Sequence, residues 1–179
     1  YRETLKAACT EHVVFERMMG DTPIYAEVTC EFAPISAGET AFDIKNAVKT
    51  PNVPKAFIAA AERALQDGLR TGGLSGYPLI YVAATLVDLK FSAENTTEGA
   101  VAGAVLQCID QMLPKAGTVI LEPLMHLEIL TPEDTVGEIS MYLQPRRAII
   151  SDIETLGSMK KVICQVPLAE MFGFGKALP

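Results

Sequence analysis

The sequence has few of the residues that bind metal ions or form disulfide frameworks. It contains two histidines, His12 and His126, and four widely separated cysteines, Cys9, Cys30, Cys108 and Cys164. No Cys-x-x-Cys pair occurs, and neither histidine lies near a cysteine along the chain. Structural zinc sites require such clusters, so we predict no metal site and expect four free thiols in a reducing compartment.

Long apolar runs and regions of positive charge are also missing. No stretch of about 18 apolar residues is present, so no membrane-spanning helix is expected. No basic segment followed by an apolar one stands at the start, so we expect no signal peptide and a cytoplasmic location. Fifteen Lys and Arg against 22 Asp and Glu give a net charge of −7, which argues against binding to nucleic acid by charge alone.

None of the usual catalytic motifs is complete. The run Gly173-Phe174-Gly175-Lys176 ends in Gly-Lys, but Glu170 occupies the first glycine position of a phosphate-binding loop. No Gly-x-Ser-x-Gly elbow is present, and Glu122 and Glu128 on one predicted strand lie too far apart for a two-carboxylate site. We therefore predict no catalytic residue in these 179 residues.

What is present is the apolar content and periodicity of a folded protein, with 49% hydrophobic residues. Alternation predicts a strand over 23–32 and a weaker one over 41–47, and a β-type run covers 79–91. A helix is predicted to begin after Pro54 and to end at Gly72-Gly73. A second, largely buried helix follows residues 95–98, where Asn95 and Glu98 have the spacing of a capping box, and ends at Pro114 and Gly117.

A second module is predicted to begin near residue 118. It is expected to contain a strand over 119–130 interrupted by Pro123, a helix starting with Thr131 as the N-cap and stopped by Pro145, and strands over 148–154 and 159–166. A final helix is predicted over 168–172. This β-α-β-β-α order is the beginning of a ferredoxin-like split βαβ unit without its last strand. We expect the module to expose a sheet edge and to be less stable than the first, or to pair with another copy.

Several sequence blocks resemble the C-terminal part of elongation factor G. They occur in the family's order over nearly the whole chain: Tyr1-Arg2-Glu3-Thr4, Gly76-Tyr77-Pro78, Leu121-Glu122-Pro123-Leu124-Met125, Thr131-Pro132-Glu133, Arg146-Arg147 and Val166-Pro167-Leu168-Ala169-Glu170-Met171-Phe172-Gly173. The resemblance implies an α+β chain of two modules. Residues 1–118 would be a ribosomal-protein-like βαβ domain, the family's fourth, and residues 119–179 an incomplete ferredoxin-like fifth domain, truncated at its C-terminus.

The same resemblance implies a mechanical role without covalent chemistry. In the family, the fourth domain reaches the decoding region of the small ribosomal subunit and helps to move tRNA and mRNA, and the fifth touches rRNA at the large-subunit stalk base. The expected partners are therefore the ribosome, rRNA and tRNA, with no membrane and no DNA. No cofactor is expected here, because GTP and Mg²⁺ would bind the N-terminal GTPase domain, and the start at Tyr1 suggests a piece of a longer factor.

Two tip loops and one arginine pair are the contact residues that the resemblance implies. The tip residues are Met19, Gly20, Asp21, Ser92, Glu94 and Asn95, and the expected rRNA contacts are Arg146 and Arg147. Both tip loops depart from the family pattern, since Met18-Met19-Gly20-Asp21 replaces a Gly-rich run and Ser92 stands where a histidine is usual. Glu94 adds a negative charge that RNA phosphates would repel.

Alternative functions follow from these departures. A paralogue that splits ribosomes during recycling is one alternative to a translocation factor. A stand-alone RNA- or ribosome-binding module is another. A small-molecule, kinase-like enzyme would need a glycine-rich loop opening a helix, and residues 94–96 before the second helix contain no glycine.

Overall fold

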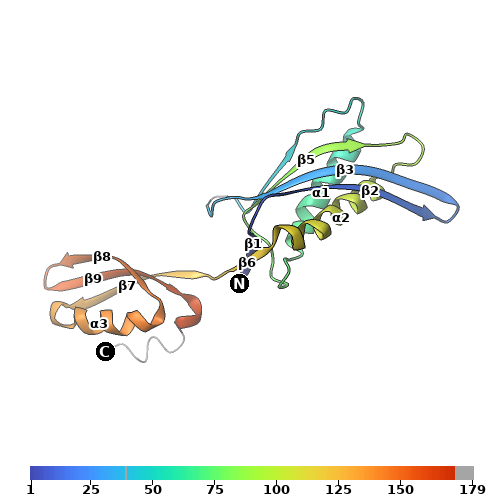
Figure 1. Ribbon diagram of the computed structural model, residues 1–179. Coiled ribbons are helices and arrows are strands. Elements are labelled where there is room, and N and C mark those ends of the chain that lie inside the picture. Colours follow the sequence, from blue (N-terminus) through green and yellow to red (C-terminus); the bar gives the residue numbers. More distant parts are fainter. Residues whose placement is uncertain (39, 172–179) are drawn as a thin grey trace. The chain divides into compact units, whose positions relative to one another are not determined.

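The computed structural model describes residues 1–38 and 40–171 (Figure 1). The chain forms two compact units, Tyr1–Leu121 and Glu122 onward. The division falls after Leu121, whereas the sequence places the boundary at residue 118. Both units mix sheets and helices, so the predicted α+β class is confirmed. We describe each unit by itself.

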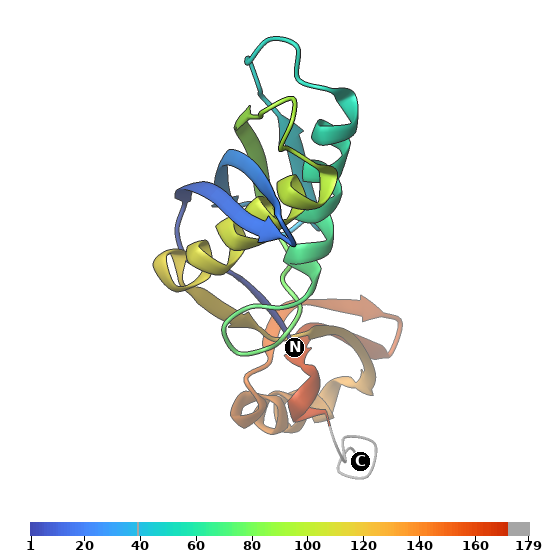
Figure 2. The same cartoon turned by 90° about the vertical axis from the view of Figure 1, so that its right-hand side faces the viewer.

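Unit 1 is built on a four-stranded sheet with two helices on one face (Figures 1 and 2). The strands are β2 (Cys9–Met19), β3 (Thr22–Pro34), β5 (Val82–Lys90) and β4 (Phe42–Asn46), in that spatial order. β4 runs parallel to β5, and the other neighbours are antiparallel. Alternate residues of β3 are fully buried, namely Ala26, Val28, Cys30 and Phe32. The predicted strands over 23–32, 41–47 and 79–91 are thus confirmed with shifted ends.

The two helices of unit 1 are α1 (Lys55–Arg70) and α2 (Glu98–Ala116). Their apolar faces join the sheet in one core, which includes Leu65, Leu69, Val101, Val105 and Met112. At Gly68 the helices approach so closely that a Cβ would lie 2.6 Å from Ile109 Cδ1. This close approach explains a glycine inside α1, where it costs about 1 kcal/mol relative to alanine.

The N-terminus of α2 differs from the predicted capping box. The N-cap is Thr97, whose Oγ1 accepts a hydrogen bond of 3.0 Å from the Ala100 N–H. Glu98 is therefore the first helical residue, and the predicted box between Asn95 and Glu98 is wrong. Pro114 lies inside the last turn, and the helix ends at Ala116 before Gly117, whose φ is +70°.

A separate two-stranded sheet joins the two ends of unit 1. β1 (Arg2–Leu5) pairs antiparallel with β6 (Thr118–Leu121). The sequence prediction of one strand over 119–130 is wrong, because Pro123 separates β6 from β7 (Leu124–Pro132) and the two strands join different sheets. Proline has no N–H for a strand ladder, so the chain changes sheets at this residue.

Unit 2 is a three-stranded antiparallel sheet with one α-helix. The strands are β7, β9 (Met159–Pro167) and β8 (Ile149–Leu156), in that spatial order. Between β7 and β8 come the 3₁₀ turn Glu133–Thr135, α3 (Val136–Leu143) and the 3₁₀ turn Gln144–Arg146. The predicted N-cap at Thr131 is wrong, because the α-helix begins only at Val136 and the Thr131 hydroxyl contacts that of Thr135. The order β-α-β-β confirms the ferredoxin-like start.

The last predicted helix is only partly described. Leu168–Glu170 forms one 3₁₀ turn after β9. The remainder of the predicted helix, at Phe172, and the Gly173–Lys176 run lie outside the described residues.

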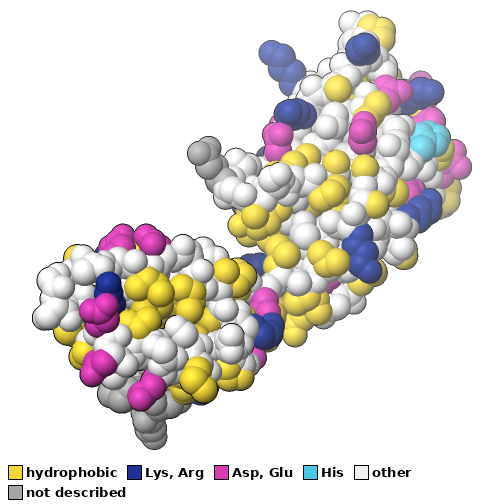
Figure 3. Space-filling model, turned by 60° about the vertical axis from the view of Figure 1, so that its left-hand side comes forward, with side chains coloured by type: hydrophobic (Ala, Val, Ile, Leu, Met, Phe, Trp, Pro, Cys, Tyr) yellow, Lys and Arg dark blue, Asp and Glu magenta, His cyan; other side chains and the backbone are white. Residues whose placement is uncertain are grey.

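Unit 2 has a small core, and this leads to a prediction. Among the residues that the structure describes, five form its buried cluster, Ile129, Ile139, Leu143, Val162 and Cys164, whereas the core of unit 1 contains 23. Apolar side chains such as Ile149, which is 67% exposed, and Met141, which is 74% exposed, remain on its surface, and Figure 3 shows such groups gathered on unit 2. Because stability rises with the apolar surface buried, we expect unit 2 to unfold first.

Hydrogen exchange of the 179-residue chain tests this order of unfolding. The amides of β9 are expected to exchange through a lower-energy opening than those of β3, although both strands are central in their sheets. Equal protection of the two strands would show that the smaller core does not limit unit 2.

Candidate functional site

The β2–β3 hairpin extends beyond the rest of the sheet of unit 1. β3 pairs with β5 only as far as Glu27 opposite Lys90, whereas β2 and β3 continue to pair up to Met19 opposite Thr22. The outer part of the hairpin is therefore a two-stranded ribbon, and its end is visible in Figure 1. Gly20 has φ +67° in the two-residue turn, a conformation that glycine adopts without strain. Met18 and Met19 are 65% and 68% exposed there.

A second segment, residues 91–97, lies beside the base of this ribbon. The Tyr25 N–H donates to the Asn95 carbonyl at 3.0 Å. The segment is closed by Thr96, whose buried hydroxyl accepts from the Ser92 N–H at 2.8 Å while its N–H donates to the Ser92 carbonyl at 3.0 Å. β3 thus holds the second tip segment in place through its backbone.

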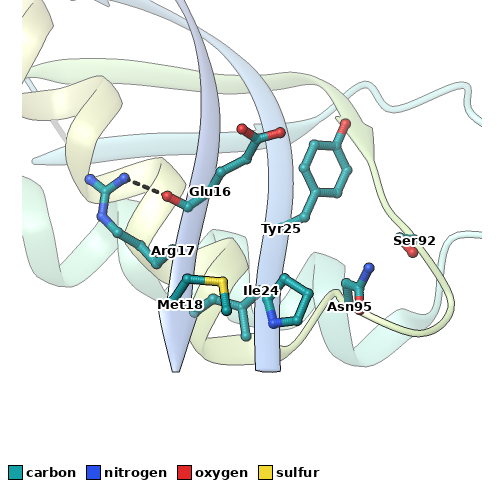
Figure 4. A pocket seen from close by; sticks show the side chains of 8 residues that line it. Glu16, Arg17, Met18, Ile24, Tyr25, Ser92 and Asn95 are labelled. Atoms are coloured by element: carbon teal, nitrogen blue, oxygen red, sulfur yellow. Dashed lines mark hydrogen bonds between the residues drawn. The ribbon is translucent and has the colours of Figure 1, made fainter. Parts of the chain in front are cut away.

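An open pocket of about 470 Å³ lies between these two segments (Figure 4). The ribbon supplies Glu16, Arg17, Met18, Pro23, Ile24 and Tyr25, and the second segment supplies Ser92 and Asn95. Of the tip residues predicted from the sequence, the structure brings Ser92 and Asn95 into this pocket. Met19, Gly20 and Asp21 lie at the ribbon end, and Glu94 is exposed on the second segment; none of these four lines the pocket.

The pocket residues of the ribbon were not identified from the sequence. To identify them, the strand register of the hairpin is needed, which places Glu16 opposite Tyr25 and Met18 opposite Pro23. A tight turn recognised at Gly20-Asp21 fixes this register, because a two-residue hairpin loop determines all the pairs behind it. The Gly20-Asp21 turn in the sequence could therefore have identified these pocket residues.

A hydrogen-bonded triad lies on the open sheet face next to the pocket. Glu27 Oε1 lies 2.6 Å from His12 Nε2, and Glu27 Oε2 accepts from the Tyr25 hydroxyl at 2.6 Å. The hydrogen bonds from Tyr25 and then His12 lower the pKa of Glu27. The same bond to Glu27, together with burial, raises the pKa of Tyr25 to about 12.

This triad predicts a specific alkaline behaviour. The folded-state pKa of Tyr25 is raised above its usual value of about 10, so its contribution to stability is complete below about pH 10 and is lost as the pH rises towards 12. We expect Tyr25→Phe to reduce the fall in unfolding free energy across this interval, measured by urea denaturation. Tyr142→Phe in unit 2 is the matched control. An unchanged alkaline slope in Tyr25→Phe would contradict the assignment.

Arg17 is held along the helix-facing side of the ribbon. Its guanidinium carbon lies 4.6 Å from the centre of the Phe15 ring, and its Nη1 donates to the Glu16 carbonyl at 2.8 Å. The ring in turn contacts α2 at Gly103, where a Cβ would lie 2.8 Å from Phe15 Cζ. Arg17 is the one arginine among residues 9–34. Its positively charged guanidinium is attracted to the face of the Phe15 ring.

The arginine pair of unit 2 is engaged within the unit. Arg147 forms two hydrogen bonds to the Glu122 carboxylate, at 2.7 and 2.8 Å, and a third at 3.2 Å to Glu170. These bonds raise the pKa of Arg147, and the Arg147 guanidinium lowers the pKa of Glu122. Arg146 donates to the Glu170 carbonyl at 2.6 Å and lies 4.4 Å from the Tyr142 ring centre. The predicted RNA contacts therefore tie together three segments of unit 2.

The described ranges 1–38 and 40–171 contain neither a cluster of metal-binding side chains nor a membrane-spanning helix. No group of three or more His, Cys, Asp or Glu side chains in them could hold a metal ion. No helix in these ranges combines the length and apolar character needed to cross a membrane.

Comparison with known proteins assigns both units. Residues 1–117 match the family model for domain IV of elongation factor G, and residues 119–179 match the model for the elongation factor G C-terminus. The chain belongs to the elongation factor G family.

A solved structure has the same arrangement of elements. The chain is similar to the crystal structure of ttk003000868 from Thermus thermophilus, with 26% sequence identity and a TM-score of 0.87. The match covers 99% of this chain and 26% of that one, so the chain spans about a quarter of the relative's length. The two matched domains do not include the family's GTPase domain.

Proposed function

We propose that this chain contacts the ribosome as the domain IV and C-terminal part of a factor that moves tRNA and mRNA. The observation that carries this proposal is the ribbon end with its exposed Met18 and Met19, which extends past the third strand of the sheet. In this proposal the ribbon end and residues 92–95 enter the decoding region of the small subunit. Unit 2 contacts rRNA at the large-subunit stalk base, in the cytoplasm.

The work proposed for these residues is steric and not chemical. We propose that no covalent step is catalysed within the chain, and that GTP and Mg²⁺ bind only the family's GTPase domain. Arg146 and Arg147 remain the proposed rRNA contacts of unit 2. A phosphate must compete there with Glu122 and Glu170 for Arg147, so we expect this contact to strengthen in Glu122→Gln.

Site-directed cross-linking tests the placement of the ribbon. A photoreactive amino acid at Asp21, in the exposed hairpin turn, is expected to cross-link to small-subunit RNA when the 179-residue chain is incubated at high concentration with ribosomes. The matched control carries the same group at Ser36, which is exposed and follows the opposite end of β3. Equal cross-linking from both positions, or none from Asp21, would contradict the proposal.

The acidic tip favours a second candidate, a factor that splits ribosomes during recycling. Glu16, Asp21 and Glu94 place three carboxylates around the tip, and Ser92 stands where a histidine is usual in the family. Carboxylates weaken contacts with RNA phosphates, so a tip with these groups is expected to hold RNA less tightly. A full-length factor with these loops is then expected to translocate weakly and to split ribosomes; vigorous translocation would exclude this candidate.

A further inference from the structure

The pocket between the ribbon and residues 92–95 combines an apolar surface with polar groups at its edge. Its volume of about 470 Å³ lies in the range of about 300–1,000 Å³ that is typical of small-molecule sites. Met18, Pro23 and Ile24 give it an apolar wall, while Glu16, Ser92 and Asn95 supply hydrogen-bonding groups. In Figure 4, Ser92 and Asn95 lie on one side and the ribbon side chains on the other.

The polar groups are available and their backbone is fixed. Asn95 is held through its carbonyl by the Tyr25 N–H, so its side-chain amide is not needed for the fold. Among the residues that the structure describes, no hydrogen bond to the Asn95 amide and no ion pair of the Glu16 carboxylate is found within the usual distances. A half-buried amide on a rigid backbone is prepared to bind a ligand without a large loss of side-chain entropy.

The charges at the tip select among ligands. Arg17 is the cation that lines the pocket, and its guanidinium already lies over Phe15 and bonds to the Glu16 carbonyl. Glu16 lines the pocket, and the exposed Glu94 directly precedes Asn95 in the sequence, so a phosphate is disfavoured there. A neutral group with N–H donors for Glu16 and a flat apolar face for the ribbon side chains fits these charges.

We propose that the pocket receives one unstacked nucleobase that carries an exocyclic amino group. In this arrangement the base face packs on Met18 and Pro23, and its edge is read by the Asn95 amide and the Glu16 carboxylate. Paired hydrogen bonds from Asn to adenine, and from a cytosine amine to Glu, are established modes of base recognition. The proposal rests on the proposed function, because it names the RNA element that the tip would read.

Binding of short single-stranded RNA to the 179-residue chain tests the pocket. The probes are a heptamer of uridines, the same heptamer with a central adenosine or cytidine, and one with a central abasic site, each monitored by fluorescence anisotropy and by NMR of the Asn95 side-chain amide. We expect about 5-fold tighter binding or more for the amino-bearing bases than for uridine, the low end of what a bidentate contact supplies. The salt dependence is expected to be shallow, because few phosphates are neutralised.

Variants separate the pocket from the general surface. Asn95→Ala and Glu16→Ala are each expected to remove the preference for adenosine and cytidine, while Glu31→Ala, an exposed acid of β3 outside the pocket, leaves it unchanged. Equal binding of all heptamers, no binding of any, or a preference retained in Asn95→Ala would overturn the proposal. If Asp21 cross-links to the ribosome but the heptamers show no preference for adenosine or cytidine, the proposed function is retained and the base-binding pocket is rejected. If the chain prefers these bases but Asp21 does not cross-link to the ribosome, the pocket is retained and the proposed function is rejected.

Discussion

Replacing Gly73 by alanine is expected to destabilise unit 1 by about 3 kcal/mol or more, because the new methyl group overlaps a buried carboxylate. A Cβ at this position would lie 2.1 Å from Glu3 Oε2. Glu3 is fully buried and cannot turn away, since its Oε1 accepts from the N–H groups of Ser75 (2.9 Å) and Tyr77 (3.0 Å). Relief of the overlap therefore requires breaking these two bonds.

Urea unfolding followed by circular dichroism measures this effect, and Gly99→Ala provides the matched control. A Cβ at Gly99 meets only Thr97 Oγ1 at 3.8 Å, so this change in α2 is expected to be neutral or to stabilise by up to about 1 kcal/mol. Combining Gly73→Ala with Glu3→Ala should cost less than the sum of the single changes, because the second removes the carboxylate that the first strikes. Strict additivity would show that Glu3 is not the obstacle.

Reversing the charge of Arg147 is expected to destabilise unit 2 while leaving the stability of unit 1 unchanged. Arg147→Glu replaces a guanidinium that binds Glu122 and Glu170 with a third carboxylate at the same point. Like charges at hydrogen-bonding distance repel, and the bonds that join residues 122, 147 and 170 are lost. Hydrogen exchange read separately for β9 and β3 distinguishes loss of unit 2 from loss of the whole chain.

Two further variants identify the cause of that loss. The double variant Glu122→Arg/Arg147→Glu exchanges the two charges, and it should restore much of the protection of the β9 amides against hydrogen exchange. Arg147→Gly removes the guanidinium but relieves a backbone φ of +56°, so its loss should be smaller than that of Arg147→Glu. If the exchanged pair is no better than Arg147→Glu, the charge contacts do not hold the unit together.

The regular elements of unit 1 could be predicted where apolar periodicity was undisturbed. β3, β5, α1 and α2 follow this rule, because their buried positions are occupied by apolar side chains. β1 and β2 were not predicted. Each contains a buried glutamate, Glu3 and Glu11, which interrupts the expected alternation. The partners of these carboxylates, the 73–77 loop and Lys115, are distant in sequence and are known only from the fold.

Some of the proposed contact residues at the tip could be identified from the sequence. The residues that bind Arg146 and Arg147 could not. Ser92 and Asn95 were identified from the family resemblance, but the register that brings them beside Tyr25 is a tertiary feature. Arg146 and Arg147 were expected as rRNA contacts, without any partner inside the chain being predicted. Glu122 is 25 residues away from its partner Arg147, and no local pattern links the two.

The pairing of β1 with β6 determines how unit 1 responds to mechanical load. Arg2 lies opposite Leu121, so tension applied to the chain at these two residues opens the ladder from its outer end, one pair at a time. Such unzipping needs less force than shearing, in which all pairs of a ladder break together. The strand pairs from Arg2 to Leu5 are therefore expected to separate before the core strands bear tension. Tension applied to unit 1 through Arg2 and Leu121 would therefore meet a compliant element in series with a stiff one.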